Sequence, residues 1–313
     1  MQKEQIHRQL FEHLLIPDDS NIDQAQRLFH GRGHAYQNLH HICIDWLPPV
    51  ALITLFAPEP TSEIKKIADD LQLKIPHCKS VQLQHRYLKH GPIEVISGKA
   101  IQQLDVLENQ LKFQIDLNKN RNTGLFLDMK NGRSWIQNHS KGKRVLNLFA
   151  YTCGFSVAAI SGEARSVFNI DMSSPSLNIG RENHRLNNQS LRNVRFEKLN
   201  IFKSLGRIKK HGRYDLLICD PPTFQKGSVD ILRDYPKIMR KIDQFMSPES
   251  SLMLCLNAPH TGKQTGQDYL IEKMKENAPE YIFKEEIKSP KVYVDAENKG
   301  LKTLIFKRKK TTV

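Results

Sequence analysis

The spacing of apolar residues changes along the chain, and the first part shows a mixed pattern. In residues 2–15 an apolar residue recurs every fourth position, which is typical of a helix with one buried face. Residues 41–56 form a longer apolar run that Pro48-Pro49 interrupts. Because two adjacent prolines break strand pairing and favour a bend, this run predicts two strands joined by a turn.

Further elements of both kinds follow in the first part of the chain. Residues 61–73 begin with polar residues and an acid ahead of an apolar period, which predicts a helix capped by Thr61 or Ser62. Two shorter apolar runs predict strands, at 81–88 and 111–117. We therefore expect a small α+β domain over residues 1–110 and a second domain over residues 111–313.

From Arg144 onward the pattern becomes a strict alternation of strand and helix. Ser174-Pro175 opens one helix, with the serine as cap and the proline at the first helical position. Repeated strand–helix units predict a parallel sheet with right-handed crossovers. The last two strands suggest an antiparallel hairpin at its edge. Seven strands are expected, at 144–149, 165–171, 194–200, 214–220, 251–257, 281–288 and 301–308.

Composition adds a preference for polyanions. The 313 residues carry 47 Lys and Arg against 33 Asp and Glu, a net charge of +14. Such an excess favours a nucleic-acid partner, although the same residues could form a merely solvated surface. No apolar run is long enough to cross a membrane, and the first residues lack the apolar core of a signal peptide. The five scattered cysteines form no CxxC pair, so we expect a cytoplasmic protein without disulfides.

Polar residues stand where successive strands of the predicted parallel sheet end. These residues are Gly154 in the first turn, then Asp171, Asn200, Asp220 and Asn257. In an open α/β sheet ligands bind beyond the carboxyl ends of the strands, where an acid after the second strand suits a ribose diol. The first turn has one glycine and not the G-x-G-x-x-G spacing of pyrophosphate sites, which disfavours a dinucleotide.

The segment Asp220-Pro221-Pro222-Thr223-Phe224 is the sharpest local signal. Two prolines stiffen the loop and fix a carboxylate and an aromatic ring at the rim, where both suit a planar base. The alternative is a structural loop with Phe224 in the core, because proline and aspartate are common in loops. Its position after the fourth strand favours function.

The order and spacing of these segments resemble the bacterial large-subunit ribosomal RNA methyltransferase family, which includes cytosine carbon-5 and guanine nitrogen-7 enzymes. The likeness lies in NLFAYTCGFSVAA (147–159), NIDMSSPSLNIGRENHRLNN (169–188) and DLLICDPPTF (215–224). Residues 108–133 are similar to the family's lead-in segment, and parts of residues 27–99 to its middle domain. No segment of the printed sequence resembles the family's N-terminal RNA-binding PUA module, so we expect that module to be absent.

The resemblance implies an α/β, Rossmann-like, seven-stranded class I methyltransferase domain that binds S-adenosylmethionine, with a smaller N-terminal α+β domain for RNA or substrate. Large-subunit ribosomal RNA is the implied partner. The implied cofactor-binding residues are Phe126, Asp128, Arg133, Asn147, Phe149, Tyr151, Thr152, Gly154, Phe155, Asp171, Asn183, Asn200 and Asp220. The implied catalytic residues are Asp220, Pro221, Pro222, Phe224 and Asn257.

Two departures from the family pattern bear on cofactor binding. The family has glycine at the position of Cys153 and aspartate at that of Asn200. A side chain at position 153 is tolerated only where the backbone does not need a positive φ. Asparagine keeps an oxygen acceptor for the adenine amine but loses its charge.

Two other functions remain open, and the chemistry of the acceptor can be narrowed. The chain could be a non-catalytic RNA-binding protein that keeps the fold, or a methyltransferase for proteins or small molecules. Methylation of cytosine carbon-5 needs a cysteine thiolate at the rim, and the stretch after the fifth strand, 256–260, contains none. We therefore predict a base nitrogen as acceptor.

The thirteen histidines show no metal-binding spacing, so no metal site is expected.

Overall fold

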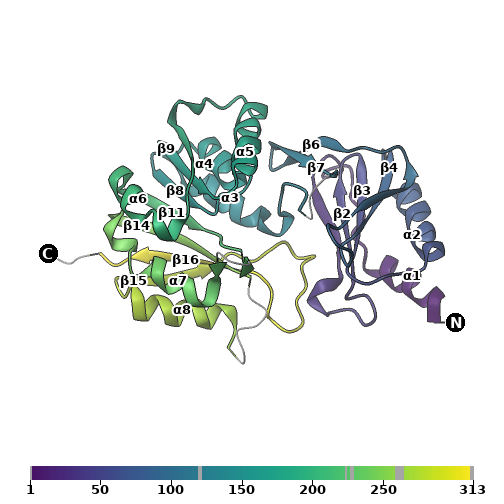
Figure 1. The fold of residues 1–313 in the computed structure, drawn as a ribbon. Coiled ribbons are helices and arrows are strands. Elements are labelled where there is room, and N and C mark those ends of the chain that lie inside the picture. The colour runs from purple at the N-terminus through teal and green to yellow at the C-terminus, as the bar shows by residue number, and fades with distance from the viewer. Residues whose placement is uncertain (1, 119–121, 223, 226–228, 258–263, 311–313) are drawn as a thin grey trace. The chain divides into compact units, whose positions relative to one another are not determined.

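The computed structural model describes residues 2–118, 122–222, 224–225, 229–257 and 264–310 (Figure 1). The chain divides into two compact units. The first comprises Met1–Lys130 and Pro290–Glu297, and the second Asn131–Ser289 and Asn298–Val313. The domain boundary expected after residue 110 lies in the turn of a β-hairpin of the first unit. Residues 290–297 return to the first unit from the far end of the sequence.

The first unit is built on a five-stranded sheet in the order β1-β2-β3-β4-β5. All its neighbouring strands are antiparallel except β3 and β4, which run parallel and are joined through helix α2. The strands are β1 (Gln26–His30), β2 (Ile42–Leu47), β3 (Val50–Leu55), β4 (Ser80–His85) and β5 (Ile93–Gly98). The helices are α1 (Gln2–His13) and α2 (Thr61–Lys74), and the separate hairpin consists of β6 (Gln103–Glu108) and β7 (Leu111–Asp116). The two strands expected around Pro48-Pro49 are confirmed as β2 and β3.

The second unit contains a seven-stranded sheet in the order β10-β9-β8-β11-β14-β16-β15. Its strands are β8 (Arg144–Leu148), β9 (Ser166–Asp171), β10 (Val194–Lys198), β11 (Tyr214–Cys219), β14 (Met246–Leu256), β15 (Tyr281–Glu286) and β16 (Lys302–Arg308). The first five are parallel, while β16 runs antiparallel to both β14 and β15. This is the predicted Rossmann-like methyltransferase sheet. The closing hairpin is confirmed, with β16 inside the sheet and β15 at the edge.

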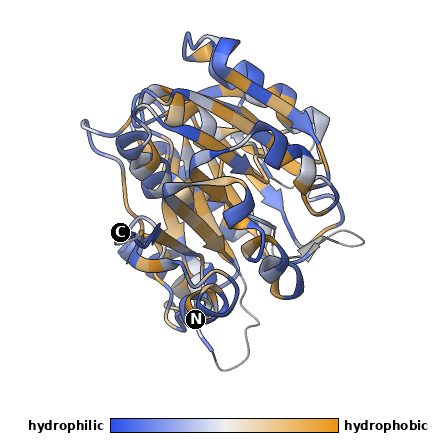
Figure 2. Ribbon diagram, turned by 90° about the vertical axis from the view of Figure 1, so that its left-hand side faces the viewer, coloured by the Kyte–Doolittle hydropathy of each residue, from blue (hydrophilic) through white to orange (hydrophobic). Residues whose placement is uncertain are grey.

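Helices connect the strands of this sheet, and two short strands, β12 (Phe224–Gln225) and β13 (Val229–Asp230), pair after β11. The helices are α3 (Lys130–His139), α4 (Gly154–Ser161), α5 (Ser174–Leu186), α6 (Leu205–His211), α7 (Ile231–Met239) and α8 (Gly266–Asn277). In Figure 2 hydrophobic residues are concentrated on the strands, whereas hydrophobic and hydrophilic residues alternate along the helices. No helix among the described residues has the length and apolar character to span a membrane.

Two predicted helix caps were wrong in detail. Helix α2 begins at Thr61 with Pro60 as its cap residue, and no side chain caps it. Helix α5 is capped by Ser173, whose side chain accepts a hydrogen bond from the amide of Ser176, and not by Ser174. In both cases several adjacent residues are good caps, so composition alone does not select the residue that leaves the helical conformation.

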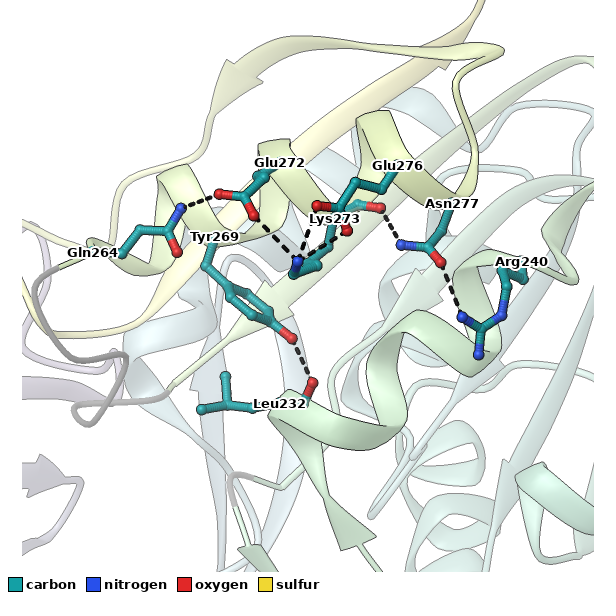
Figure 3. A network of polar contacts seen from close by, with 8 residues as sticks. All are labelled: Leu232, Arg240, Gln264, Tyr269, Glu272, Lys273, Glu276 and Asn277. Carbon is teal, nitrogen blue, oxygen red and sulfur yellow. Dashed lines mark hydrogen bonds and ion pairs between the residues drawn. The ribbon is translucent and has the colours of Figure 1, made fainter.

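Helices α7 and α8 are joined by polar contacts (Figure 3). The Tyr269 hydroxyl of α8 donates to the Leu232 carbonyl of α7 at 2.6 Å, and Arg240 donates to Asn277 at 3.2 Å. Lys273 pairs with Glu272 and Glu276 along α8. The Tyr269 and Arg240 hydrogen bonds hold α7 against α8, and α7 carries a side chain that the candidate site needs.

Candidate functional site

The ends of β8, β9, β10, β11 and β14 bring together most of the residues predicted to bind a ligand. Phe149, Tyr151, Gly154, Asp171 and Asn200 are half-buried, as is Asp220. Asn257, directly after β14, is exposed. Since these strands are parallel neighbours, their carboxyl ends form one rim of the sheet.

The loop after β8 has an unusual backbone. Three of its residues other than glycine adopt the left-handed conformation, with φ of 58° at Phe149, 47° at Tyr151 and 62° at Cys153. This conformation costs roughly 1–2 kcal/mol for a residue with a side chain. Such residues gather at functional sites, where the surrounding structure imposes them.

Two side chains hold this loop in place. Asp171 accepts hydrogen bonds from the Tyr151 amide at 2.9 Å and from the Ser173 amide at 2.7 Å. The buried amide of Asn183 donates to the Thr152 carbonyl at 2.9 Å. Asp171 therefore links the loops after β8 and β9 while remaining half-exposed. The Asn183 side chain holds the loop after β8 by bonding a backbone carbonyl of that loop.

Cys153 has a left-handed backbone, a conformation that suits glycine. This is the positive φ at which a side chain in place of the family's glycine was expected to be unfavourable. Its thiol is completely buried and faces Gly180 of α5. A Cβ atom on Gly180 would lie 2.5 Å from the Cys153 sulfur. The absence of a side chain at position 180 thus provides the space that Cys153 fills.

We predict that Gly180→Ala destabilises the protein by about 1–3 kcal/mol, the usual cost of forcing extra volume into a packed region. Cys153→Gly should restore most of that loss, since it removes the sulfur and suits the left-handed backbone. Gly206→Ala in α6 is the control, because nothing lies within 4 Å of its Cβ position. Urea denaturation of the three variants and the double variant measures the coupling. Equal stability of the Gly180→Ala and Gly206→Ala variants would contradict the packing argument.

A buried chain of polar side chains lies behind the loop and includes Asn147. Its successive hydrogen bonds join Asn147 to Asn169, Asn169 to Ser156 and Ser156 to His184, each at 2.9 Å, and His184 to Gln189 at 2.6 Å. Burial lowers the pKa of His184 to about 4, so its imidazole is neutral at pH 7. Gln189 donates its amide to the Val157 carbonyl, which leaves its oxygen to accept from His184 Nδ1. The structure favours a positioning role for Asn147, which is 1% exposed, over direct contact with a ligand.

Tyr235 of α7 connects the ends of β11 and β14. Its buried hydroxyl lies 3.0 Å from the Cys219 carbonyl and 3.1 Å from the Cys255 carbonyl. Cys219 immediately precedes Asp220, and Cys255 lies two residues before Asn257. One buried phenol therefore sets the spacing of two strand ends that carry predicted catalytic residues. A tyrosine that bonds backbone carbonyls has no sequence signature, so Tyr235 could not be predicted as a site residue.

The start of α7 is held by Asp234. This buried carboxylate accepts from the Asp230 amide at 3.0 Å and pairs with Arg233 and Lys237 at 2.9 and 2.7 Å. These cations hold the pKa of Asp234 well below its usual range. Asp230 pairs with Phe224 across the β12–β13 hairpin, so Asp234 supports the segment that follows the two prolines.

The remaining predicted residues are placed as follows. Pro221 is buried and Pro222 is exposed, Phe224 begins β12, and Thr223 lies outside the described residues. Asn200 caps a short 3-10 helix by accepting from the Lys203 amide at 3.3 Å, while Thr152 and Phe155 are buried. Arg133 is buried in α3 of the second unit. Phe126 and Asp128 belong to the first unit, where Phe126 is 44% exposed.

Comparison with known proteins agrees with the sheet topology. Residues 26–307 match the model of a family described as S-adenosylmethionine-dependent methyltransferase. The chain is 34% identical over 149 residues to ribosomal RNA large subunit methyltransferase I of Tolumonas auensis, a match covering 46% of this chain and 38% of that protein. It is 34% identical over 209 residues to ribosomal RNA large subunit methyltransferase K/L of Pseudoalteromonas translucida, covering 64% of this chain and 29% of that protein. The matched segments thus span less than half of these relatives.

A solved structure shares the fold over nearly the whole chain. It belongs to a protein of Streptococcus mutans assigned as a SAM-dependent methyltransferase. The TM-score is 0.81 at 23% identity, and the match covers 97% of this chain and 80% of that protein. The two-unit architecture is therefore found in another protein.

Proposed function

Because the chain belongs to the S-adenosylmethionine-dependent methyltransferase family, we propose that it transfers a methyl group from S-adenosylmethionine to a base of ribosomal RNA. The acceptor in this proposal is a ring or exocyclic nitrogen. The observation that carries it is the strained loop after β8, anchored by the half-exposed Asp171 at the rim of a methyltransferase sheet. Its relatives named as ribosomal RNA large subunit methyltransferases support the choice of substrate.

The hydrogen-bonding groups at the rim suit this cofactor. Asp171 uses its carboxylate oxygens to accept two backbone amides, and each oxygen retains a further lone pair for a ribose hydroxyl. Asn200 lies two residues after β10, and its side-chain amide, whose oxygen also accepts from the Lys203 amide, would meet the adenine edge. The left-handed residues Phe149, Tyr151 and Cys153 bend the loop just before Gly154. Because Gly154 has no side chain, the cofactor could approach the backbone there closely.

The residues after β11 and β14 are suited to hold the acceptor base. When bound, S-adenosylmethionine supplies an electrophilic methyl group attached to a sulfonium centre. Asp220 and Asn257 would accept hydrogen bonds from donors of the base and orient its nitrogen lone pair. Pro221-Pro222 restricts the loop, and stacking of the base on Phe224 stays a prediction from the sequence. Tyr235 is a positioning residue, since it acts on both strand ends through their carbonyls.

An RNA substrate agrees with the charge of the chain. A net charge of +14 favours phosphate contacts, and such a reaction belongs in the cytoplasm, where ribosomal RNA is found. We assign the first unit to RNA binding as part of the same proposal.

Methyl transfer to purified ribosomal RNA, followed by nucleoside mass spectrometry, tests the proposal. Ribosomal RNA from cells lacking the gene is the substrate, and we expect the protein to add to it a methylated base that this RNA lacks before the reaction. RNA binding without cofactor binding or transfer would instead support a non-catalytic RNA-binding protein. Transfer to proteins or small molecules, but not to RNA, would place the substrate in another class.

Asp171→Ala is expected to weaken binding of S-adenosylmethionine by about 1–3 kcal/mol, because it removes a hydrogen-bond acceptor from a partly buried site. Isothermal titration calorimetry measures the change. Asp215→Ala is the matched control, since Asp215 lies at the opposite end of β11, where it accepts from the Arg144 amide at 2.9 Å. Cofactor affinity that is unchanged in Asp171→Ala would show that the rim residues have been assigned wrongly.

A further inference from the structure

Basic and aromatic side chains gather along one edge of the five-stranded sheet in the first unit, an edge formed by the ends of its strands and not by an outer strand. At this edge β1, β3 and β4 end and β2 begins, because Leu55 is paired with both Ile42 and His85. We call it the basic edge and define it by Arg32, His34, His40, Arg86, Tyr87 and Lys89. These residues come from the two segments 31–41 and 85–92.

Contacts place both segments beside the end of β3. The Arg32 guanidinium lies 4.4 Å from the centre of the Phe56 ring, and the Phe56 amide donates to the His41 carbonyl at 2.8 Å. His34 and His40 stack with ring centres 5.4 Å apart. The Arg86 amide donates to the Leu55 carbonyl at 2.8 Å, which places the second segment beside Phe56.

The two segments carry a fixed positive charge, which comes from Arg32, Arg86 and Lys89, since histidines are neutral at pH 7. Segments 31–41 and 85–92 contain two arginines, one lysine and five histidines, and neither has an acidic residue. Carboxylates of neighbouring segments offset part of this charge. Glu59 pairs with His41 and Glu94 with His85, and the Ala296 amide, between Asp295 and Glu297, donates to the Gly33 carbonyl. Burial and the neighbouring His41, His34 and Arg32 lower the pKa of His40, as expected in a positive potential.

Tyr87 is an aromatic ring held in place while it remains exposed. His85 Nδ1 lies 2.9 Å from the Tyr87 hydroxyl, and His85 Nε2 lies 2.8 Å from Glu94. The Glu94 carboxylate accepts from Nε2 and so fixes the orientation of the imidazole, which holds the Tyr87 hydroxyl through its other nitrogen. Nevertheless Tyr87 is 38% exposed, and its neighbour Leu88 is 44% exposed. A fixed, exposed ring among cations is the arrangement on which single-stranded bases stack.

We infer that the basic edge binds a single-stranded segment of the RNA substrate, with a base stacked on Tyr87 and phosphates contacted by Arg32, Arg86 and Lys89. The inference rests on the proposed RNA substrate and adds the place and form of its recognition. A metal site is the other use of clustered histidines, but the described residues contain no group of three or more suitable ligands.

Binding of labelled oligouridine, followed by fluorescence anisotropy over a range of KCl concentrations, tests the charges. Arg32→Gln/Lys89→Gln should weaken binding about tenfold and lower the slope of log K against log[salt] by about 1.4, or about 0.7 per lost phosphate contact. Lys79→Gln/Lys99→Gln is the matched control, because both lysines are exposed at the opposite edge, beside the paired residues Ser80 and Gly98. An equal loss in the two double variants would overturn the inference, since it would reflect only the overall charge.

Tyr87 provides an independent test of stacking. Tyr87→Ala should weaken oligouridine binding about five- to a hundredfold, whereas Tyr87→Phe, which keeps the ring, should lose much less. Binding of an adenine–uracil duplex should not respond to Tyr87→Ala. If the alanine variant binds oligouridine like wild type, or if duplex and single strand bind equally, the inference is wrong.

Cofactor binding and methyl transfer separate this inference from the proposed function. The edge variants should bind S-adenosylmethionine like wild type and raise KM for RNA without lowering kcat. Unchanged KM in variants of an enzyme that methylates ribosomal RNA would overturn only the basic edge. Specific loss of oligouridine binding in a protein that methylates no RNA would overturn only the proposed function.

Discussion

Asp220→Asn should lower the rate of methyl transfer by about a hundredfold or more, with much smaller changes in stability and cofactor affinity. Groups that orient a base or accept its proton contribute about 10²–10⁴ to rate. Asp220 is half-buried directly after β11, and a neutral amide in its place presents a donor where the proposed base also presents a donor. Single-turnover transfer to RNA measures the chemical step.

Two variants frame this result. Asp69→Asn, on the exposed face of α2, should retain full activity. Tyr235→Phe keeps the Asp220 carboxylate and removes only the hydroxyl that bridges the Cys219 and Cys255 carbonyls, so a smaller loss in kcat is expected, about tenfold. Full activity of Asp220→Asn would remove Asp220 from the catalytic machinery, whatever Tyr235→Phe shows.

The parallel sheet could be predicted from sequence because its strands are buried on both faces. Strands β8 and β11 and the second half of β14 (residues 252–256) are therefore largely apolar runs bounded by polar residues. Strand β5 was missed, since most of its residues are half-exposed or exposed and its sequence alternates weakly. Helix α3 was missed as well, because Gly132 lies in its first turn and weakens the helical signal.

The positions of rim residues could be predicted, but the contacts that hold them could not. Strand ends locate Asp171 and Asp220 from the sequence pattern alone. In contrast, Cys153 packs against Gly180 of another element. The cysteine in place of the family's glycine is explained only by the space that Gly180 leaves, and the sequence pattern does not show that the two residues meet. The same holds for His184, which bonds Ser156 across 28 sequence positions inside the fold.

The identity of the methylated atom depends on whether a thiolate is available. Cytosine carbon-5 becomes nucleophilic after a cysteine thiolate adds to the neighbouring ring carbon, whereas a ring or exocyclic nitrogen needs only orientation and acceptors for the donors of its base. A carbon-5 enzyme therefore requires an accessible cysteine of low pKa at the rim.

The cysteines near this rim do not meet that requirement. Cys153, Cys219 and Cys255 are each completely buried. Burial raises the pKa of the Cys153 and Cys219 thiols well above the usual range, so both remain protonated at neutral pH. Cys255 lies within β14, two residues before the exposed Asn257. A nitrogen acceptor agrees with these positions.

RNA containing 5-fluorocytidine distinguishes the two chemistries, because a carbon-5 enzyme forms a stable covalent adduct through its cysteine. We expect no adduct on denaturing gels, in the presence of S-adenosylmethionine and under conditions in which a known carbon-5 methyltransferase forms one. Methyl transfer to unmodified RNA should also survive Cys255→Ala within about tenfold, whereas loss of a catalytic nucleophile abolishes turnover. An adduct that disappears in Cys255→Ala would reverse the assignment, since it would show that this thiol reaches the base and that carbon-5 is the acceptor.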